Sequence, residues 1–332
     1  TEFYDALGCS MRYIHYYTGS PDPVVRRFDD SVEFCEELDE ARGQGLYVYD
    51  TPHGQLVQRL VLTVDRTWRT VGFPVKTPAD LRALTWLYRH TTYHFDADYF
   101  RQGSELMGER GEPQFWVPKS PYQALAQRWM KLPDLIYALA DAPDTVHEAM
   151  RAIDDSYDPL YQEIVDSGLV HIVNLGENIH DQLLSPRYWE QYLLPFYEKR
   201  CGQLRAAGIY SHNHIDGYFR SLLPYLAEAP FDGIEALTPA PQGDVELEEI
   251  AEAIGDKVLL DGIPAVLFMP QYSLEELMAF VERVVALFAP RLVLGISDEL
   301  PEGTDESVLE RVAMISAWCR EHPNRGTRAD RR

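Results

Sequence analysis

Short apolar runs alternate with amphipathic helical segments from about residue 112 onward. The runs that predict strands are Gln114–Val117, Val170–Leu175, Ile209–Ser211, Gly233–Ala236, Val258–Leu260 and Leu292–Ile296. Nearly continuous apolar strands that alternate with helices are typical of a parallel sheet covered by helices. We therefore expect an α/β protein built on a parallel sheet.

Several helices between these strands have recognisable start and stop signals. Ser185 precedes a proline, and Ser273 stands three residues before Glu276, which is the spacing of a capping box. Gly255 is placed to end the helix that begins near residue 245, and Pro195 should bend the helical run that contains it. These signals support the helical assignment independently of the apolar pattern.

The first hundred residues are less regular. Gly45–Asp50 predicts a strand, and Gln58–Val64 with Thr67–Val71 predicts a hairpin. Thr77 followed by proline predicts a helix start. We expect residues 1–110 to form an extension packed on the main fold, 111–322 the main part of that fold, and 323–332 a disordered basic tail.

About seven strands without a linker between them favour a single distorted TIM barrel of the (β/α)8 type. An open doubly wound sheet is the alternative, and it normally has a glycine-rich phosphate turn after its first strand. The 332 residues contain no G-x-G-x-x-G and no G-x-x-x-x-G-K-[ST] pattern. The barrel is therefore the preferred prediction.

The net charge of the chain excludes some classes of binding partner. The chain has 30 Lys and Arg against 53 Asp and Glu, a formal net charge of −23. An acidic surface repels phosphate backbones and anionic lipids, so we expect neither nucleic acid nor a membrane as a partner. No apolar stretch approaches the roughly 18 residues of a membrane helix, and the scattered cysteines form no C-x-x-C pair. We expect a cytoplasmic protein.

Acidic, histidine and asparagine residues follow five consecutive predicted strands, at the end where a β/α barrel holds its active site. These residues are Glu177, Asn178 and His180; His212, His214 and Asp216; Glu235; Asp261; and Asp298 and Glu299. We predict that His214, Asp216, Glu177 and Asp298 are catalytic, and that the remaining residues bind substrate. Asn178 in an Asx turn, His180 at a helix cap and Asp261 in a tight turn are the structural alternatives.

Two further predictions concern charge and metal. Alternate residues of an extended segment point the same way, so His212, His214 and Asp216 can share one face. His214, Asp216 and Asp298 are the candidate ligands of a divalent metal such as zinc, whereas a backbone hydrogen bond and a helix cap are the alternative roles. Arg12 can fold over the barrel mouth and clamp an anion, or form a surface salt bridge.

A series of short motifs is similar to the uroporphyrinogen decarboxylase superfamily, and more closely resembles its corrinoid-dependent methyltransferase branch. The motifs are Ser185–Pro195, His214–Gly217, Leu222–Tyr225, Asp232–Pro239, Gly243–Val245, Asp261–Pro264 and Leu294–Glu299. They extend over roughly residues 110–318 in order and spacing, and the resemblance implies a distorted TIM barrel.

The same motifs also distinguish between the branches of the superfamily. Uroporphyrinogen decarboxylase itself holds its tetrapyrrole with an arginine-rich N-terminal motif. In this chain only Arg12 resembles a part of that motif. Methylcobamide methyltransferases hold zinc by H-x-C and a distant cysteine, and Asp216 and the Ser297–Asp298 region stand at those places in this chain. The His214–Gly217 and Gly295–Glu299 forms look like the O-demethylase branch, which passes a methyl group from a methyl ether to a corrinoid protein.

The resemblance therefore implies a methyltransferase that moves a methyl group from a small methylated donor to a corrinoid (cobalamin) acceptor. The acceptor would arrive on a corrinoid protein or free, since this chain lacks a D-x-H-x-x-G cobalamin signature. A decarboxylase or lyase acting on a small organic acid, and a non-catalytic ligand-binding barrel, are the alternatives. A homodimer is left open.

Overall fold

The computed structural model describes residues 2–64, 66–181, 183–297, 299–300 and 305–322. The chain divides into two compact units. Unit 1 comprises residues 1–23, 97–117 and 169–332, and unit 2 comprises residues 24–96 and 118–168. Each unit contains residues from both sides of the boundary predicted at residue 110. The chain leaves unit 1 after residue 23, returns to it at residue 97, and leaves it again for residues 118–168. The predicted tail, residues 323–332, lies outside the described residues.

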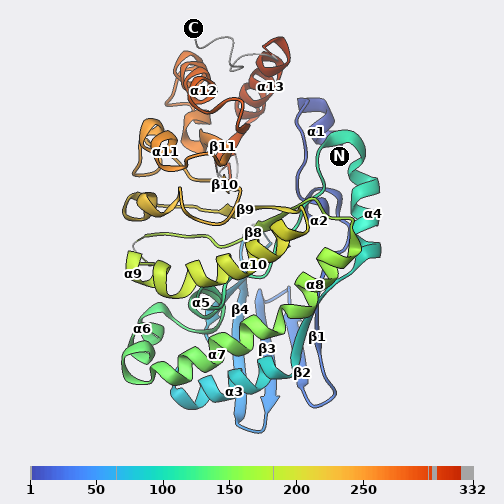
Figure 1. The fold of residues 1–332 in the computed structure, drawn as a ribbon. Helices are drawn as coiled ribbons and strands as arrows, with labels where there is room; N and C mark the ends of the chain where they lie inside the picture. Colours follow the sequence, from blue (N-terminus) through green and yellow to red (C-terminus); the bar gives the residue numbers. More distant parts are fainter. Residues whose placement is uncertain (1, 65, 182, 298, 301–304, 323–332) are drawn as a thin grey trace. The chain divides into compact units, whose positions relative to one another are not determined.

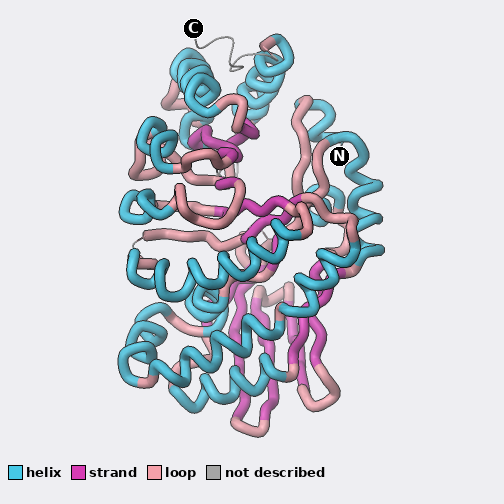
Figure 2. The backbone as a smooth tube through the Cα atoms, in the orientation of Figure 1, coloured by secondary structure: helices cyan, strands magenta, loops and turns pink. Residues whose placement is uncertain are grey.

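Unit 1 is built on a parallel sheet with the strand order β12-β11-β10-β9-β8-β7 (Figures 1 and 2). The strands are β7 (Trp116–Val117), β8 (Ile172–Leu175), β9 (Tyr210–His214), β10 (Gly233–Glu235), β11 (Val258–Pro264) and β12 (Leu292–Ser297). Every strand predicted after residue 112 is present, so the parallel α/β sheet is confirmed.

The sheet does not close into a barrel among the described residues, where β7 and β12 are its edges. A barrel needs strands that join these two edges, and the strands that precede β7 are antiparallel ones in unit 2 instead. Beside β7, Tyr13 makes an isolated parallel bridge to Gln114. This bridge fixes the N-terminal segment at the β7 edge of the sheet.

Helices connect the strands of unit 1. They are α1 (Glu2–Leu7), α2 (Ile14–Thr18), α4 (Ala97–Met107), η1 (Gly108–Arg110), α9 (Pro186–Tyr188), η3 (Trp189–Leu193), α10 (Leu194–Ala206), η4 (Arg220–Tyr225), α11 (Leu247–Ala253), η5 (Ala265–Phe268), α12 (Leu274–Phe288) and α13 (Glu306–Glu321). The apolar side of α12 is buried through Leu277, Val281 and Val284. Ile263 of β11 belongs to the same buried cluster as Leu277 and Val281.

Local sequence signals account for the ends of these helices. Ser273 and Glu276 form the predicted capping box of α12, and the Ser185 side chain accepts from the backbone N–H of Tyr188 at the start of α9. Gly255 follows α11 with a φ of +61°, a conformation that glycine adopts without strain. The run that contains Pro195 is a π-helical turn, η3, followed by α10, in whose first turn the proline needs no N–H partner.

Unit 2 has a four-stranded antiparallel sheet, β2-β3-β4-β5, and a separate pair, β1-β6. The strands are β1 (Val24–Phe28), β2 (Glu33–Asp39), β3 (Gln44–Thr51), β4 (Gly54–Leu62), β5 (Trp68–Gly72) and β6 (Thr91–Phe95). The predicted hairpin is β4-β5, with a bulge at Arg59 and Leu60.

The helices of unit 2 are α3 (Pro78–Arg89), α5 (Pro121–Ala124), the π-helical turn η2 (Leu125–Trp129), α6 (Leu132–Asp141), α7 (Pro143–Ser156) and α8 (Asp158–Ser167). Thr77 caps α3 as predicted, and Asp80 completes a capping box. Helix α3 packs on α7 and on β4.

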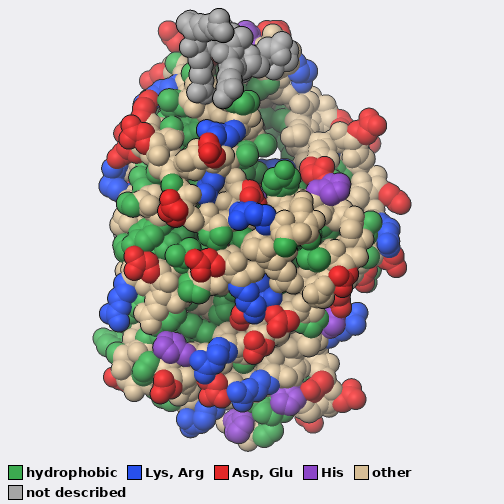
Figure 3. Space-filling model, in the orientation of Figure 1, with side chains coloured by type: hydrophobic (Ala, Val, Ile, Leu, Met, Phe, Trp, Pro, Cys, Tyr) green, Lys and Arg blue, Asp and Glu red, His purple; other side chains and the backbone are tan. Residues whose placement is uncertain are grey.

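Acidic side chains are scattered among basic ones over the face drawn in Figure 3. None of the described helices is long and apolar enough to cross a membrane.

Candidate active site

Four neighbouring strands of unit 1 place polar side chains in one buried cluster. Asn174 comes from β8, His212 and His214 from β9, Glu235 from β10 and Asp261 from β11. The parallel register sets Glu235 directly beside His214. Alternation along β9 then puts His212 and His214 on the same side of that strand.

Glu235 is the centre of this cluster, and both of its carboxylate oxygens are occupied. Oε1 accepts from the Tyr13 hydroxyl and lies 2.9 Å from Nη1 of Arg12. Oε2 accepts from Nδ2 of Asn174 and lies 3.0 Å from Nδ1 of His214. Burial alone would raise the pKa of Glu235, but the hydrogen bond with His214 and the nearby positive charges lower it. Glu235 is therefore ionised at neutral pH.

The two histidines differ in their protonation. Burial lowers the pKa of His212 to about 4, and its Nε2 lies 2.6 Å from Oε1 of Gln114. Burial is the largest effect on the pKa of His214 and acts to lower it, but the hydrogen bond to Glu235 and the charges of the nearby carboxylates together outweigh burial, so the net shift is upward. Those carboxylates are Glu235, Asp216 and Asp261. His212 is thus a neutral structural ring, whereas His214 gains a proton readily.

Arg12 joins the second acid to the cluster. Its Nη2 lies 2.8 Å from Oδ1 of Asp261, and the two side chains form an ion pair. Burial raises the pKa of Asp261 to about 6, against the effect of Arg12, and the charge of Glu235 adds to the rise. The backbone of Asp261 has a φ of +82°, and a side chain at Gly295 would collide with its carboxylate. The fold thus places a carboxyl that titrates near neutrality beside a permanent cation.

We expect the titration of Asp261 to make the free energy of unfolding depend on pH. Its folded pKa of about 6 is above the ordinary value of 3.8, so the folded state binds the proton more tightly. The free energy of unfolding should fall as pH rises from about 4 to about 6. Urea unfolding of the wild type and of Asp261→Asn over this range isolates the effect, because Asn cannot titrate. An identical pH dependence in both proteins would contradict the raised pKa.

Among the residues that the structure describes, no third ligand for a metal lies at His214. Glu235 is already bound by Tyr13, Arg12, Asn174 and His214. No group of three or more His, Cys, Asp or Glu among the described residues is arranged to hold an ion. Asp298, the third predicted ligand, lies outside those residues. The side chains that are described do not fit a metal, and we derive no step through one.

The other predicted site residues lie as follows. Glu177 is buried, and its charge contributes to the pKa of Cys201, which burial raises to about 11. Asn178 has a φ of +54°, and its backbone N–H donates to the His214 carbonyl. The His180 ring lies 5.3 Å from that of Tyr218. Glu299 is exposed. Their predicted roles remain predictions.

Sequence reasoning missed Tyr13, Asn174 and Gln114 as members of the cluster. Tyr13 stacks on Trp116 at a centroid distance of 4.0 Å, which brings its hydroxyl to Glu235. The available signal was a polar residue inside an apolar strand, because Asn174 interrupts the run of β8 and is fully buried. Buried amides are nearly always hydrogen-bonded, so such a residue indicates a polar network.

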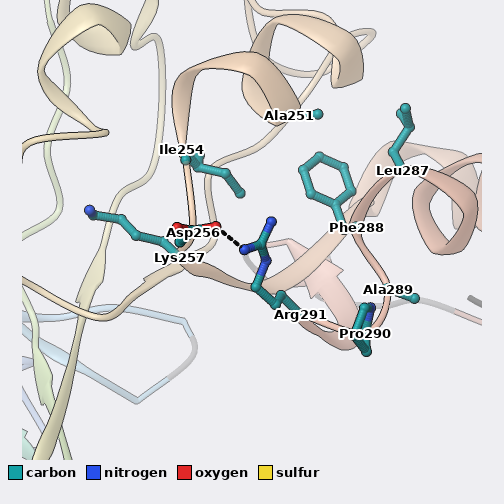
Figure 4. A pocket seen from close by; sticks show the side chains of 10 residues that line it. Ala251, Ile254, Asp256, Lys257, Leu287, Phe288, Ala289, Pro290 and Arg291 are labelled. Atoms are coloured by element: carbon teal, nitrogen blue, oxygen red, sulfur yellow. Dashed lines mark hydrogen bonds and ion pairs between the residues drawn. The ribbon is translucent and has the colours of Figure 1, made fainter. Parts of the chain in front are cut away.

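A cavity of about 550 Å³ lies elsewhere, at the amino-terminal ends of β11 and β12 (Figure 4). Its lining includes Phe288, Pro290, Lys257 and an ion pair between Arg291 and Asp256. Active sites of parallel α/β folds lie at the opposite ends of the strands. The acid–histidine cluster, and not this cavity, is therefore the candidate active site.

These observations define an α/β protein with a buried acid–histidine cluster at the strand ends of its parallel sheet. A family model described as uroporphyrinogen decarboxylase (URO-D) matches residues 125–316. This match covers more than half of the chain, so the chain belongs to the URO-D family. The resemblance inferred from the sequence motifs is confirmed.

Two solved structures align with this chain. A methyltransferase from Methanosarcina mazei aligns with a TM-score of 0.56 and 11% identity, over 78% of this chain and 74% of that chain. A B12-independent methionine synthase from Shewanella sp. W3-18-1, in complex with selenomethionine, aligns with a TM-score of 0.47 and 12% identity, over 79% of this chain and 74% of that chain. No curated protein matches the sequence. At 11% identity, the first likeness extends to the fold alone.

Proposed function

We propose that this URO-D family protein is a methyltransferase that moves a methyl group from a small methyl ether to a corrinoid. The proposal rests on the pair of His214 and Glu235. Glu235 favours the protonated form of His214, and protonated His214 can give its proton to the leaving oxygen of a methyl ether. The family membership and the fold shared with a methyltransferase support it. The same family implies that the sheet closes into a barrel, and we propose this closure as well.

His214 is the proposed general acid. Its Nδ1–H donates to Glu235, which leaves Nε2 to carry the transferable proton. The side chain is 21% exposed, so it is accessible while Glu235 behind it is buried. Glu235 keeps the ring in one orientation and favours its charged form, as a carboxylate does for a catalytic histidine.

The reaction balances with His214 as the proton source. The bond between the methyl carbon and the ether oxygen breaks, and the oxygen keeps the electron pair and takes the proton from Nε2. The methyl carbon bonds to the acceptor, and the product is an alcohol or phenol. A corrinoid supplies a cobalt nucleophile when bound, and we propose that it arrives as a substrate, either on a partner protein or free.

The assay is methyl transfer to free cob(I)alamin from a panel of methyl ethers, followed by the absorbance of methylcobalamin. We expect methylcobalamin to form at a rate proportional to protein concentration and only with some of the donors. A chelator-treated sample tests separately the metal predicted from the sequence, and we expect it to keep full activity, because the described side chains do not fit a metal. The absence of transfer from every ether, with a folded protein, would contradict the proposal.

Decarboxylation of a small organic acid is the second candidate, and Asp261 is the observation that favours it. A carboxyl with a pKa of about 6 can protonate a carbanion at neutral pH. However, Arg12 is already paired with two carboxylates, which leaves it a poor clamp for a substrate anion. Release of carbon dioxide from a panel of acids, without methyl transfer, would select this reaction.

A non-catalytic ligand-binding protein would also keep its acids paired with Arg12. It would show neither activity, and substitution of His214 would then affect only the affinity for a ligand. The homodimer left open by the sequence is tested by sedimentation of the purified chain.

A further inference from the structure

Two arginines of unit 2 lie among aromatic rings, and neither forms an ion pair with a described Asp or Glu. Arg26 is on β1, and its Cζ is 4.5 Å from the centroid of the Phe28 ring. The rings of Tyr49, Tyr88, Tyr93 and Trp129 also lie within 6 Å of this atom. Arg128 is in the π-helical turn η2, and its Cζ is 5.6 Å from the Trp129 ring. We call the side chains of Arg26 and Arg128 the arginine pair.

The two guanidinium groups meet at one oxygen atom. Nη1 of Arg26 lies 3.5 Å from the Tyr49 hydroxyl, and the same tyrosine is a hydrogen-bond partner of Arg128. Two positive charges therefore stand close together, in surroundings where burial strengthens their repulsion.

The surroundings do not balance this charge. Among the described residues, no Asp or Glu forms an ion pair with Arg26 or Arg128, whereas Arg12 of unit 1 has two carboxylate partners. The ring faces attract a cation but accept no strong hydrogen bond. Nε and Nη2 of Arg26 are buried without an acceptor. A buried donor that lacks its partner is costly, so the pair as it stands is incomplete.

The two arginine side chains are not fully enclosed, although Nε and Nη2 of Arg26 are buried. Arg26 and Arg128 are each partly exposed. Tyr49, Tyr88 and Trp129 beside them are at most 2% exposed and form a rigid apolar floor. Arg128 lies in a π-helical turn, a feature that is frequent at functional sites.

We propose that Arg26 and Arg128 form a binding site for a phosphate-sized dianion on unit 2, separate from the acid–histidine cluster of unit 1. A guanidinium group donates two parallel hydrogen bonds to a phosphate, and two guanidinium groups match its two charges. A monoanionic carboxylate would neutralise only one of them. The ligand class is therefore a phosphoryl group, free or on a small molecule.

The test is calorimetric titration of the full chain with inorganic phosphate at pH 8, with ionic strength held constant by sodium chloride. We expect saturable binding at one site. Arg128→Gln and Arg26→Gln should each weaken it by at least about tenfold, the loss of a charged hydrogen-bonding group. Arg42→Gln is the matched control, because Arg42 is an exposed arginine of the same unit that pairs with Asp39, and it should bind phosphate like the wild type.

Three outcomes would overturn the proposal. One is the absence of saturable phosphate binding to the wild type at millimolar concentration. Another is an equal loss of binding in Arg42→Gln, which would indicate a general charge effect. The third is binding of acetate at the same site with no binding of phosphate. If a glutamine variant does not fold, Arg128→Lys keeps the charge but loses the two-pronged donor, and it should still weaken binding.

Discussion

Replacement of His214 by alanine is expected to lower methyl transfer by at least about 100-fold, the usual range for loss of a general acid. The physical reason is that no other described histidine, lysine or arginine of the cluster can release a proton from nitrogen to a substrate. His212 is neutral and fully buried, and Arg12 does not release its proton. Initial rates of methylcobalamin formation, compared at saturating donor, measure the effect on kcat.

The fold should survive this change. Glu235 keeps its contacts with Arg12, Tyr13 and Asn174, so thermal unfolding should shift little. His171→Ala is the matched control, since His171 is an exposed histidine of the same unit, paired with Glu112. If the His214→Ala protein keeps its activity, His214 is not the general acid and has a structural role instead.

The pH profile provides a second readout of His214. A general acid works in its protonated form, and the pKa of this ring lies above its ordinary value of 6.5. The rate should be full below the folded pKa and should fall as pH rises through it. Glu235→Gln removes the charge that raises this pKa, so the fall should move to lower pH.

Replacement of Glu235 by alanine is expected to have the largest effect on stability, about 3–5 kcal/mol in the free energy of unfolding. Removing the carboxylate leaves the buried charge of Arg12 with one partner instead of two. It also takes an acceptor from the buried Tyr13 hydroxyl and from the Asn174 amide. Urea unfolding at pH 7 measures the loss.

Lowering the pH should cause part of the same loss in the free energy of unfolding of the wild type. The pKa of Glu235 is lowered in the folded protein, so its stabilising contribution is present above the unfolded value of about 4.5 and disappears as pH falls through the folded one. Glu112→Ala is the control, because Glu112 is exposed and pairs only with the exposed His171. Exposed pairs contribute about 0–1 kcal/mol. A loss no larger in Glu235→Ala than in this control would contradict the central role of Glu235.

Much of the secondary structure of unit 1 follows from local sequence. The strands of the parallel sheet were predictable because a short apolar run marks each of them, such as Val258–Leu260 within β11, and helix signals lie between the runs. The caps at Ser185 and Ser273 depend on residues only three positions away. His214, Glu235 and Asp261 were recognisable as site residues because they stand at strand ends, and parallel strands bring such ends to one edge.

The division into units was not predictable in the same way. Residues 118–168 join residues 24–96 in unit 2, although a single helical pattern continues past residue 112. The association depends on the packing of α3 against α7, which lie far apart in the sequence. Periodicity shows that each helix has an apolar side but not which partner covers it.

The parallel α/β class, the family and the polar strand ends of this protein can all be predicted from its amino-acid sequence. Which of those strand ends meet depends on tertiary packing. Arg12 reaches Asp261 across 249 positions, and Tyr13 reaches Glu235 across 222. The protonation of His214 and Asp261 also depends on this meeting, because burial and nearby charges set a pKa, and both are properties of the folded chain.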